Sequence, residues 1–203
     1  MRDVRLRIWI VVRRIVGLLV VAPAAMAQSA YENLTPEQIM ARSTEEIAPG
    51  LYTFGSFGGR QLKLMYFGRN HGDCMLVMQL DGTDVLFVGD LVTPYSVGLG
   101  FFPDYYPGDY VRSLKEIEAL PGWSRMIGNH GIPVAPKEAL VQRRRYLEAL
   151  MDAVRGELER NELQGDALYQ SIELPEEFRQ MRGYSRNIAR AAERIAYYYG
   201  MGW

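Results

Sequence analysis

The sequence predicts an α/β fold, and two observations carry this prediction. Short runs of apolar residues, several of them alternating with polar ones as in β-strands, occupy 62–67, 75–80 and 85–88. Apolar residues recur at helical spacing over 111–120, 140–158 and 188–199. The first half of the chain is therefore expected to build a sheet, and the second half supplies most of the helices that cover it.

The first 27 residues have the pattern of a bacterial-type secretory signal. Residues 1–14 carry five arginines and one acid, 15–22 are apolar, and Ala25-Met26-Ala27 presents small residues to a signal peptidase. We expect cleavage after Ala27, a periplasmic or secreted mature chain, and no stable membrane span after cleavage. An uncleaved anchor is the alternative, although Arg13 and Arg14 interrupt the apolar stretch.

The composition excludes some classes of function. The formal net charge is −1, and loss of the five arginines and one aspartate of the signal would leave −5. This mild acidity argues against a nucleic-acid partner, which usually requires a basic surface. The length fits one domain with a real core, and the single cysteine excludes an internal disulfide.

The segment after the signal, residues 28–48, is polar and rich in glutamate. Thr35-Pro36-Glu37 is a typical helix start, so a short helix to about Ser43 is predicted. A strand is expected over 51–54, and the glycine-rich run 55–59 is expected to end it.

Three further strands are predicted before the first long helix. Residues 62–66 alternate as a half-buried strand does. The runs 75–80 and 85–88 flank an Asp-Gly turn at 81–84, which predicts a β-hairpin. The second strand of this hairpin leads directly to Asp90.

A long loop over 91–108 follows, rich in glycine, proline and aromatic residues. Its length indicates a functional segment, and its aromatic content argues against disorder. A helix over 111–120 is expected next, with Asp109 as its cap and Pro121-Gly122 at its end. A short strand then leads to His130.

The rest of the chain is predicted to be helical. An amphipathic helix is expected to begin at Pro136, and its apolar face consists of Leu140, Leu147, Met151, Val154 and Leu158. The triplet Arg143-Arg144-Arg145 is interpreted as a solvated face rather than a polyanion site. Two more helical segments are expected, one opening at 174–178 and one over 188–199.

The two histidines of the sequence each follow a predicted strand, and so does one aspartate. His71, Asp90 and His130 all lie beside glycine at such strand ends. Two imidazoles and one carboxylate suit zinc or a similar divalent ion, and three protein ligands leave a position for water. The metal lowers the pKa of that water to about 7, which makes it a nucleophile. The alternative is that all three are ordinary loop residues.

The order of these motifs resembles the metallo-β-lactamase superfamily. The family's G-x-x-H loop is similar to residues 68–73 (GRNHGD). A hydrophobic hairpin follows in the family, as the predicted apolar hairpin does here, and the family's L-F-x-G-D segment is similar to residues 85–92 (VLFVGDLV). Residues 128–131 (GNHG) are similar to its P-G-H-G segment, with asparagine in place of Pro-Gly. The resemblance covers roughly 47–160 and implies a partial metallo-β-lactamase-like αβ/βα sandwich with a helical C-terminal extension.

The resemblance also implies a division of the chain. A signal peptide would occupy 1–27, a polar segment 28–48, a truncated metallo-β-lactamase-like domain 49–160, and C-terminal helices 161–203. In the family, His71 would belong to one metal subsite and His130 to the other, with Asp90 bridging them.

One family motif is missing from this sequence. The H-x-H-x-D-H motif would precede residue 61, but the sequence has no histidine before His71. A βα portion of the first half of the fold is expected to be absent with it. Since even outer-shell changes weaken metal binding by roughly 10–100-fold, at most one weakly held zinc is expected.

The expected function is an exported zinc-dependent hydrolase of reduced activity that acts on a small-molecule substrate. The alternative is a non-catalytic remnant of the fold that serves as a periplasmic binding or interaction module. Loss of part of the fold would expose apolar surface, and a second copy or another protein is expected to cover the half-sheet.

Five other residues are weaker candidates. Asn70 and Asn129 each precede a candidate ligand and could fix its loop through side-chain hydrogen bonds, although asparagine is also common in turns. Asp73 could be an acid near the metal or a simple loop residue. Tyr95 and Tyr105 could contact substrate or could pack within the protein.

Overall fold

The computed structural model describes residues 44–48, 51–57, 60–73, 75–97 and 105–201. The predicted signal peptide, the predicted helix from Thr35 to Ser43, and part of the predicted loop (98–104) lie outside the described residues. Internal contacts divide the chain into two compact units, Met1–Glu45 and Glu46–Trp203. The finer division into four segments remains a prediction.

No helix within the described ranges has both the length and the apolar character that crossing a bilayer requires.

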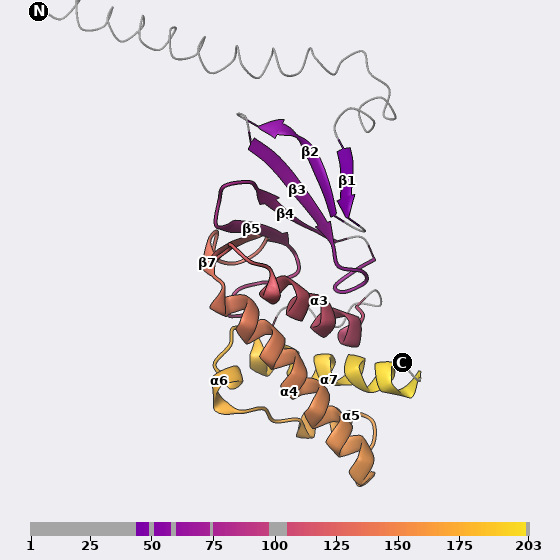
Figure 1. Ribbon diagram of the computed structural model, residues 1–203. Coiled ribbons are helices and arrows are strands. Elements are labelled where there is room, and N and C mark those ends of the chain that lie inside the picture. Colours follow the sequence, from indigo (N-terminus) through magenta and orange to yellow (C-terminus); the bar gives the residue numbers. More distant parts are fainter. Residues whose placement is uncertain (1–43, 49–50, 58–59, 74, 98–104, 202–203) are drawn as a thin grey trace, which may run out of the picture. The chain divides into compact units, whose positions relative to one another are not determined.

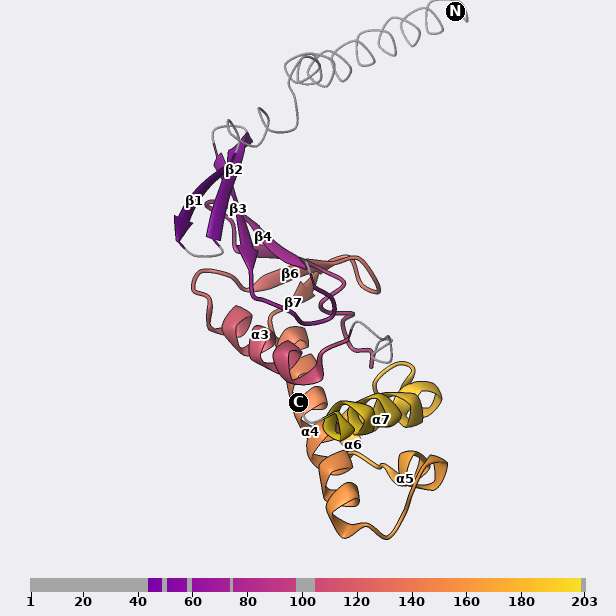
Figure 2. The ribbon, with the colours of Figure 1, turned by 90° about the vertical axis from the view of Figure 1, so that its right-hand side faces the viewer.

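The strands form one mixed sheet in which they lie in the order of the sequence (Figures 1 and 2). They are β1 (Thr44–Ala48), β2 (Leu51–Phe57), β3 (Arg60–Tyr66), β4 (Leu76–Leu80), β5 (Val85–Gly89), β6 (Arg125–Gly128) and β7 (Ala135–Pro136). Neighbours from β2 to β5 pair antiparallel, β5 and β6 pair parallel, and β6 and β7 pair antiparallel. Because β5 and β6 are parallel, the residues that follow both strands lie at the same edge of the sheet.

The helices follow from the second half of the chain. They are α3 (Pro107–Ala119), α4 (Glu138–Arg160), α5 (Asp166–Ser171), α6 (Glu176–Arg179) and α7 (Tyr184–Gly200). Helix α3 provides the crossover that the parallel strands β5 and β6 require. Helix α4 packs against both α3 and α7, and α7 also contacts α5 and α6 (Figure 1).

Several predicted boundaries were wrong, for local reasons. Helix α3 begins at Pro107, a residue suited to the first helical position, so Asp109 lies inside the first turn instead of capping it. Helix α4 begins at Glu138 because Pro136 belongs to β7. Strand β2 continues to Phe57, since an irregularity in its pairing with β3 accommodates the glycine-containing stretch.

The C-terminal part contains three helices, one more than predicted. The additional helix, α5, has six residues, too few for a helical period to stand out in the sequence. Leu158 was assigned to the apolar face of α4 but is exposed near the end of this helix.

One face of the sheet is buried under α3 and α4. Met65 pairs with Val77 across β3 and β4, and Leu86 pairs with Met126 across β5 and β6. All four side chains are buried in one core with residues of α3 and α4. The α/β class predicted from the sequence is therefore confirmed.

The opposite face of the sheet is apolar but less buried. Leu64, Met78, Phe87 and Ile127 are paired in succession across β3, β4, β5 and β6. Each alternates along its strand with a buried residue and is only half-buried itself. Within the described residues the sheet thus has helices on one face and a partly open apolar face on the other.

The sequence suggested that the arginine triplet of α4 is a solvated face, and this interpretation was wrong for one of the three residues. Arg143 is only 4% exposed and donates a hydrogen bond to the Val97 carbonyl. Its guanidinium lies 5.6 Å from the ring centroid of Tyr110 and 5.3 Å from that of Tyr146. The other two arginines of the triplet form ion pairs with glutamates. The buried cation is therefore part of the core beneath the loop after β5.

Tyr146 is predicted to make the protein sensitive to alkaline pH. Burial raises the pKa of Tyr146 to about 12, although the Arg143 guanidinium opposes the shift. The folded state thus keeps a proton that the unfolded chain loses near pH 10, so stability is intact below pH 10 and falls as the pH rises toward 12. At pH 11 the loss attributable to this group is on the order of 1 kcal/mol.

The variant Tyr146→Phe tests this prediction by urea unfolding between pH 8 and pH 11.5. The Tyr146 hydroxyl is buried and has no hydrogen-bond partner among the described residues, so its removal should not destabilise the protein at pH 8. The variant should lose less stability than the parent as the pH rises. The exposed Tyr197→Phe is the matched control, and equal pH slopes for parent and Tyr146→Phe would refute the prediction.

Candidate functional site

Asp90 is placed by the end of β5. Gly89 adopts a left-handed backbone conformation, with φ +54°, which turns the chain immediately before the aspartate. Leu91 and Val92 follow and are fully buried, so the backbone after Asp90 is anchored in the core. Tyr110 on α3 strengthens this anchor because its hydroxyl donates a hydrogen bond to the Leu91 carbonyl.

His130 reaches the same edge of the sheet from β6. The backbone N–H of Asn129 donates to the Gly89 carbonyl at 3.1 Å, which joins the two strand ends. The Nε2 atom of His130 lies 3.1 Å from Oδ1 of Asp90. This Oδ1 atom is buried, yet it receives no hydrogen bond of good geometry from the described residues. The pair therefore combines an imidazole that is 68% exposed with a carboxylate oxygen whose lone pairs are not fully used.

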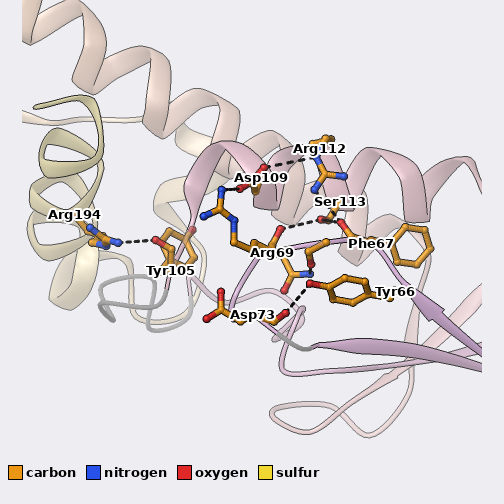
Figure 3. A network of polar contacts seen from close by, with 11 residues as sticks. Tyr66, Phe67, Arg69, Asp73, Tyr105, Asp109, Arg112, Ser113 and Arg194 are labelled. Atoms are coloured by element: carbon orange, nitrogen blue, oxygen red, sulfur yellow. Dashed lines mark hydrogen bonds and ion pairs between the residues drawn. The ribbon is translucent and has the colours of Figure 1, made fainter. Parts of the chain in front are cut away.

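The loop from 67 to 73, which carries His71, is held against α3 (Figure 3). Ser113 Oγ and Arg112 Nη2 donate to the Phe67 carbonyl at 2.8 and 2.9 Å. Arg69 Nη2 lies 3.2 Å from the Asp109 carboxylate. These contacts attach the start of the loop to the first turns of the helix.

Asn70 organises the backbone around His71. It is fully buried, its Oδ1 accepts a hydrogen bond from the His71 N–H at 2.6 Å, and its Nδ2 donates to the Gly68 carbonyl at 3.0 Å. Its own carbonyl accepts from the Tyr106 N–H at 2.9 Å. A buried asparagine with both side-chain groups bonded to the backbone defines the shape of a turn.

The structure brings Asp90 and His130 together but does not add His71 to them. The His71 ring makes an edge contact with Tyr110, at 6.4 Å between centroids, and Tyr110 in turn holds the Leu91 backbone. Within the described part of the chain, no three His, Cys, Asp or Glu side chains are grouped so that they could hold a metal ion. The donors present therefore fit part of a zinc site, and the assignment of all three as ligands remains a prediction.

The four remaining candidates occupy different environments. Asn129 and Asp73 are exposed, and the Asn129 contact described above uses its backbone. Tyr105 is buried and packs edge-on against Tyr110 at 5.5 Å, a typical core contact. Tyr95 is exposed and has a left-handed backbone, with φ +55°, which is uncommon for a residue of its size.

Sequence reasoning missed the side chains beneath the site. Tyr110 contacts His71, holds the Leu91 carbonyl and packs on Arg143, yet nothing in its helical spacing separates it from an ordinary core residue. Burial raises the pKa of both Tyr105 and Tyr110, so these phenols are neutral at physiological pH. Together they support the loop after β5 without adding charge to it.

A cavity of about 210 Å³ lies beside the Asp90–His130 pair. Its walls are Pro94, Tyr95, Gly131, Ile132 and Arg182. Gly131 follows His130 directly in the chain, and Pro94 and Tyr95 belong to the segment after Asp90. Arg182 comes from the turn before α7 and was not a candidate in the sequence.

A family comparison agrees with the motifs. The profile of the metallo-beta-lactamase superfamily matches residues 16–123, just over half of the chain. The chain belongs to the metallo-β-lactamase superfamily. The mixed sheet with helices on one face is a partial form of that fold, which is the fold of metal-dependent hydrolases.

Two solved structures are similar to part of the chain. One is a metallo-beta-lactamase from Pontibacter korlensis, with 24% sequence identity and a TM-score of 0.43, covering 47% of this chain and 45% of that one. The other is VMB-1, with 19% identity and a TM-score of 0.40, covering 52% of this chain and 44% of that one. The chain thus spans less than half the length of either structure. A search of curated proteins found no match.

Proposed function

We propose that this chain is an exported metal-dependent hydrolase of the metallo-β-lactamase type, with reduced activity toward a small-molecule substrate. The observation that carries the proposal is the Asp90–His130 pair, which lies where two parallel strands end at the same edge of the sheet. The proposed metal is zinc, held by Asp90 and His130, with His71 as the further ligand predicted from the sequence.

The donor chemistry of the pair supports this proposal. An unprotonated imidazole and a carboxylate oxygen are both ordinary zinc ligands. The buried Oδ1 of Asp90 lacks a hydrogen-bond donor among the described residues, so a cation there would compensate its desolvation. When bound, zinc would supply a water of lowered pKa as the nucleophile. The bond attacked would be of an ester, amide, thioester or sulfate type.

Weak metal affinity is part of the proposal. Two well-placed protein ligands are fewer than the three of a typical catalytic zinc site. The loop of His71 is held by α3 and by Asn70, so His71 would have to approach the pair against these contacts. Reduced activity then follows from a metal that is bound only part of the time.

The export proposal rests on the signal-like pattern of residues 1–27. Cleavage after Ala27 would deliver the domain to the periplasm or the medium, where zinc and substrate would meet it. N-terminal sequencing of the protein recovered from a bacterial periplasm would identify the mature first residue, expected to be Gln28.

Zinc binding by the purified protein tests the proposed site. Elemental mass spectrometry after equilibration with buffered zinc is expected to find up to about one zinc per chain. Asp90→Ala and His130→Ala should each weaken binding by at least about tenfold, because either change removes a direct ligand. His71→Ala reports whether the third histidine takes part.

The matched control is Asp152→Ala, which removes an exposed carboxylate from α4 and should leave zinc binding unchanged. Absence of zinc from the parent protein, or equal binding by the parent and Asp90→Ala, would refute the metal site.

A second candidate function is an interaction module without catalysis. The observation in its favour is the half-buried apolar row Leu64, Met78, Phe87 and Ile127 on the sheet face opposite α3 and α4. A second copy of the chain that places its own row on this face would bury both. A zinc-free protein that sediments as a dimer, and as a monomer after Met78→Glu, would favour this candidate over the hydrolase.

A further inference from the structure

The cavity beside the candidate site has one cationic wall and several apolar ones. Tyr95, Pro94 and Ile132 present aromatic and aliphatic surface, and Arg182 contributes the guanidinium. Tyr95 and Ile132 are both substantially exposed, as large apolar side chains at a ligand-binding surface often are. The combination of apolar walls with one placed cation selects a ligand that carries both kinds of group.

Arg182 is held in place by its backbone. Its N–H donates to the Tyr95 carbonyl at 3.0 Å, and its carbonyl accepts from the Val97 N–H at 3.2 Å and from Ser96 Oγ at 3.1 Å. Residues 96 and 182 thus form an isolated parallel bridge between the loop after β5 and the turn before α7. The same segment that follows Asp90 therefore positions Arg182.

The Arg182 guanidinium approaches the backbone beside His130. A Cβ atom placed on Gly131 would lie 3.4 Å from Arg182 Nη2 and 3.6 Å from Pro94 Cδ. Gly131 also has φ +85°, a conformation that favours glycine. Because glycine has no side chain, the Arg182 guanidinium can lie close to this backbone. In the described part of the chain the guanidinium has no acidic partner, so its charge is available to a ligand.

We infer that this cavity binds the anionic end of an organic acid, with the carboxylate or a similar anion on Arg182 and the apolar body on Tyr95 and Ile132. Guanidinium is suited to this role because its planar N–H donors match the oxygens of such anions. Arg182 lies beyond residues 16–123, the part that matches the superfamily, so the cationic wall of this subsite comes from the C-terminal part of the chain, whereas Pro94 and Tyr95 lie within the matched part. Its use by a substrate rests on the proposed hydrolase function, whereas anion binding itself does not.

The test compares phenylacetate with its neutral amide, phenylacetamide, by titration calorimetry or NMR with the full mature chain. Phenylacetate is expected to bind at least about tenfold more tightly than the amide, because a charge-assisted contact with Arg182 is available only to the anion. Arg182→Gln should remove this preference, and Arg182→Lys should retain part of it. Arg179→Gln is the control, since Arg179 is an exposed arginine on α6 that does not line the cavity.

Each titration is run with a chelator and again with zinc. An Arg182-dependent preference in the presence of chelator supports the subsite even if the protein proves to bind no metal. A preference that needs zinc and survives Arg182→Gln would mean that the carboxylate binds the metal, and the inference would then be wrong. Equal affinity of parent and Arg182→Gln for phenylacetate, or no binding by the parent, would also overturn it.

Discussion

Replacing Arg143 by alanine is expected to lower the free energy of unfolding by about 3–5 kcal/mol. The guanidinium is buried between the rings of Tyr110 and Tyr146 and donates a hydrogen bond to the Val97 carbonyl. Truncation would leave a cavity among these rings and a carbonyl without its donor. The loop after β5 would lose its support from α4, so disorder is expected to spread toward Asp90.

Two further variants separate the contributions of charge and packing. Arg143→Met keeps most of the volume and removes the charge, so it should be less destabilising than Arg143→Ala, since a buried charge also carries a desolvation cost. Arg145→Ala removes an exposed arginine that is paired with Glu177 at 2.7 Å, and it should cost less than about 1 kcal/mol. The measurement is urea unfolding near neutral pH. Equal stabilities for Arg143→Ala and Arg145→Ala would contradict the structural role of Arg143.

Gly128→Ala is expected to destabilise the protein by about 2–3 kcal/mol and to disturb the Asp90–His130 pair. A Cβ atom at Gly128 would lie 2.7 Å from the Val92 carbonyl oxygen and 3.3 Å from that of Gly89. Both atoms belong to the backbone, so they cannot move aside as the end of a flexible side chain can. The β5 and β6 ends would have to separate, and the two candidate ligands would separate with them.

Gly156→Ala is the matched control for this variant. Gly156 lies in α4, and a Cβ atom there would meet nothing within 4 Å. The same chemical change should therefore stabilise the protein by about 0.5–1 kcal/mol, because alanine is the better helix former. Thermal unfolding and zinc binding measured side by side check both variants. A Gly128→Ala protein with the parent's stability and zinc affinity would contradict the close backbone packing at this strand end.

Parts of the fold were predictable because they depend on local periodicity. The alternation in 62–66 and the Asp-Gly turn at 81–84 define β3 and the β4–β5 hairpin without reference to the rest of the chain. The long amphipathic pattern of α4 was equally clear, although its start was misplaced by the proline of β7. The ends of helices and strands were less predictable, since capping and pairing depend on neighbouring segments.

The candidate site was predictable only in part, for the same reason. The positions of Asp90 and His130 after two strands follow from the sequence, and their approach to 3.1 Å follows from the parallel pairing of β5 with β6. His71 also follows a strand, but the antiparallel strand β4 separates β3 from β5 in the sheet. A strand end thus indicates where a functional side chain lies along the chain, and the strand order decides which other side chains it meets.

The α/β class, the superfamily motifs and the three candidate ligands His71, Asp90 and His130 could all be read from the sequence alone. Tertiary contacts were needed to show that Arg143 is a core residue while its neighbours form ion pairs with glutamates, and that Arg182 lines a cavity with Gly131. The physical reason is that periodicity and turn chemistry act over a few residues. The environment of a charged side chain, in contrast, depends on distant parts of the chain. Tyr110 packs on the buried Arg143, and backbone hydrogen bonds with the segment 95–97 position the exposed Arg182.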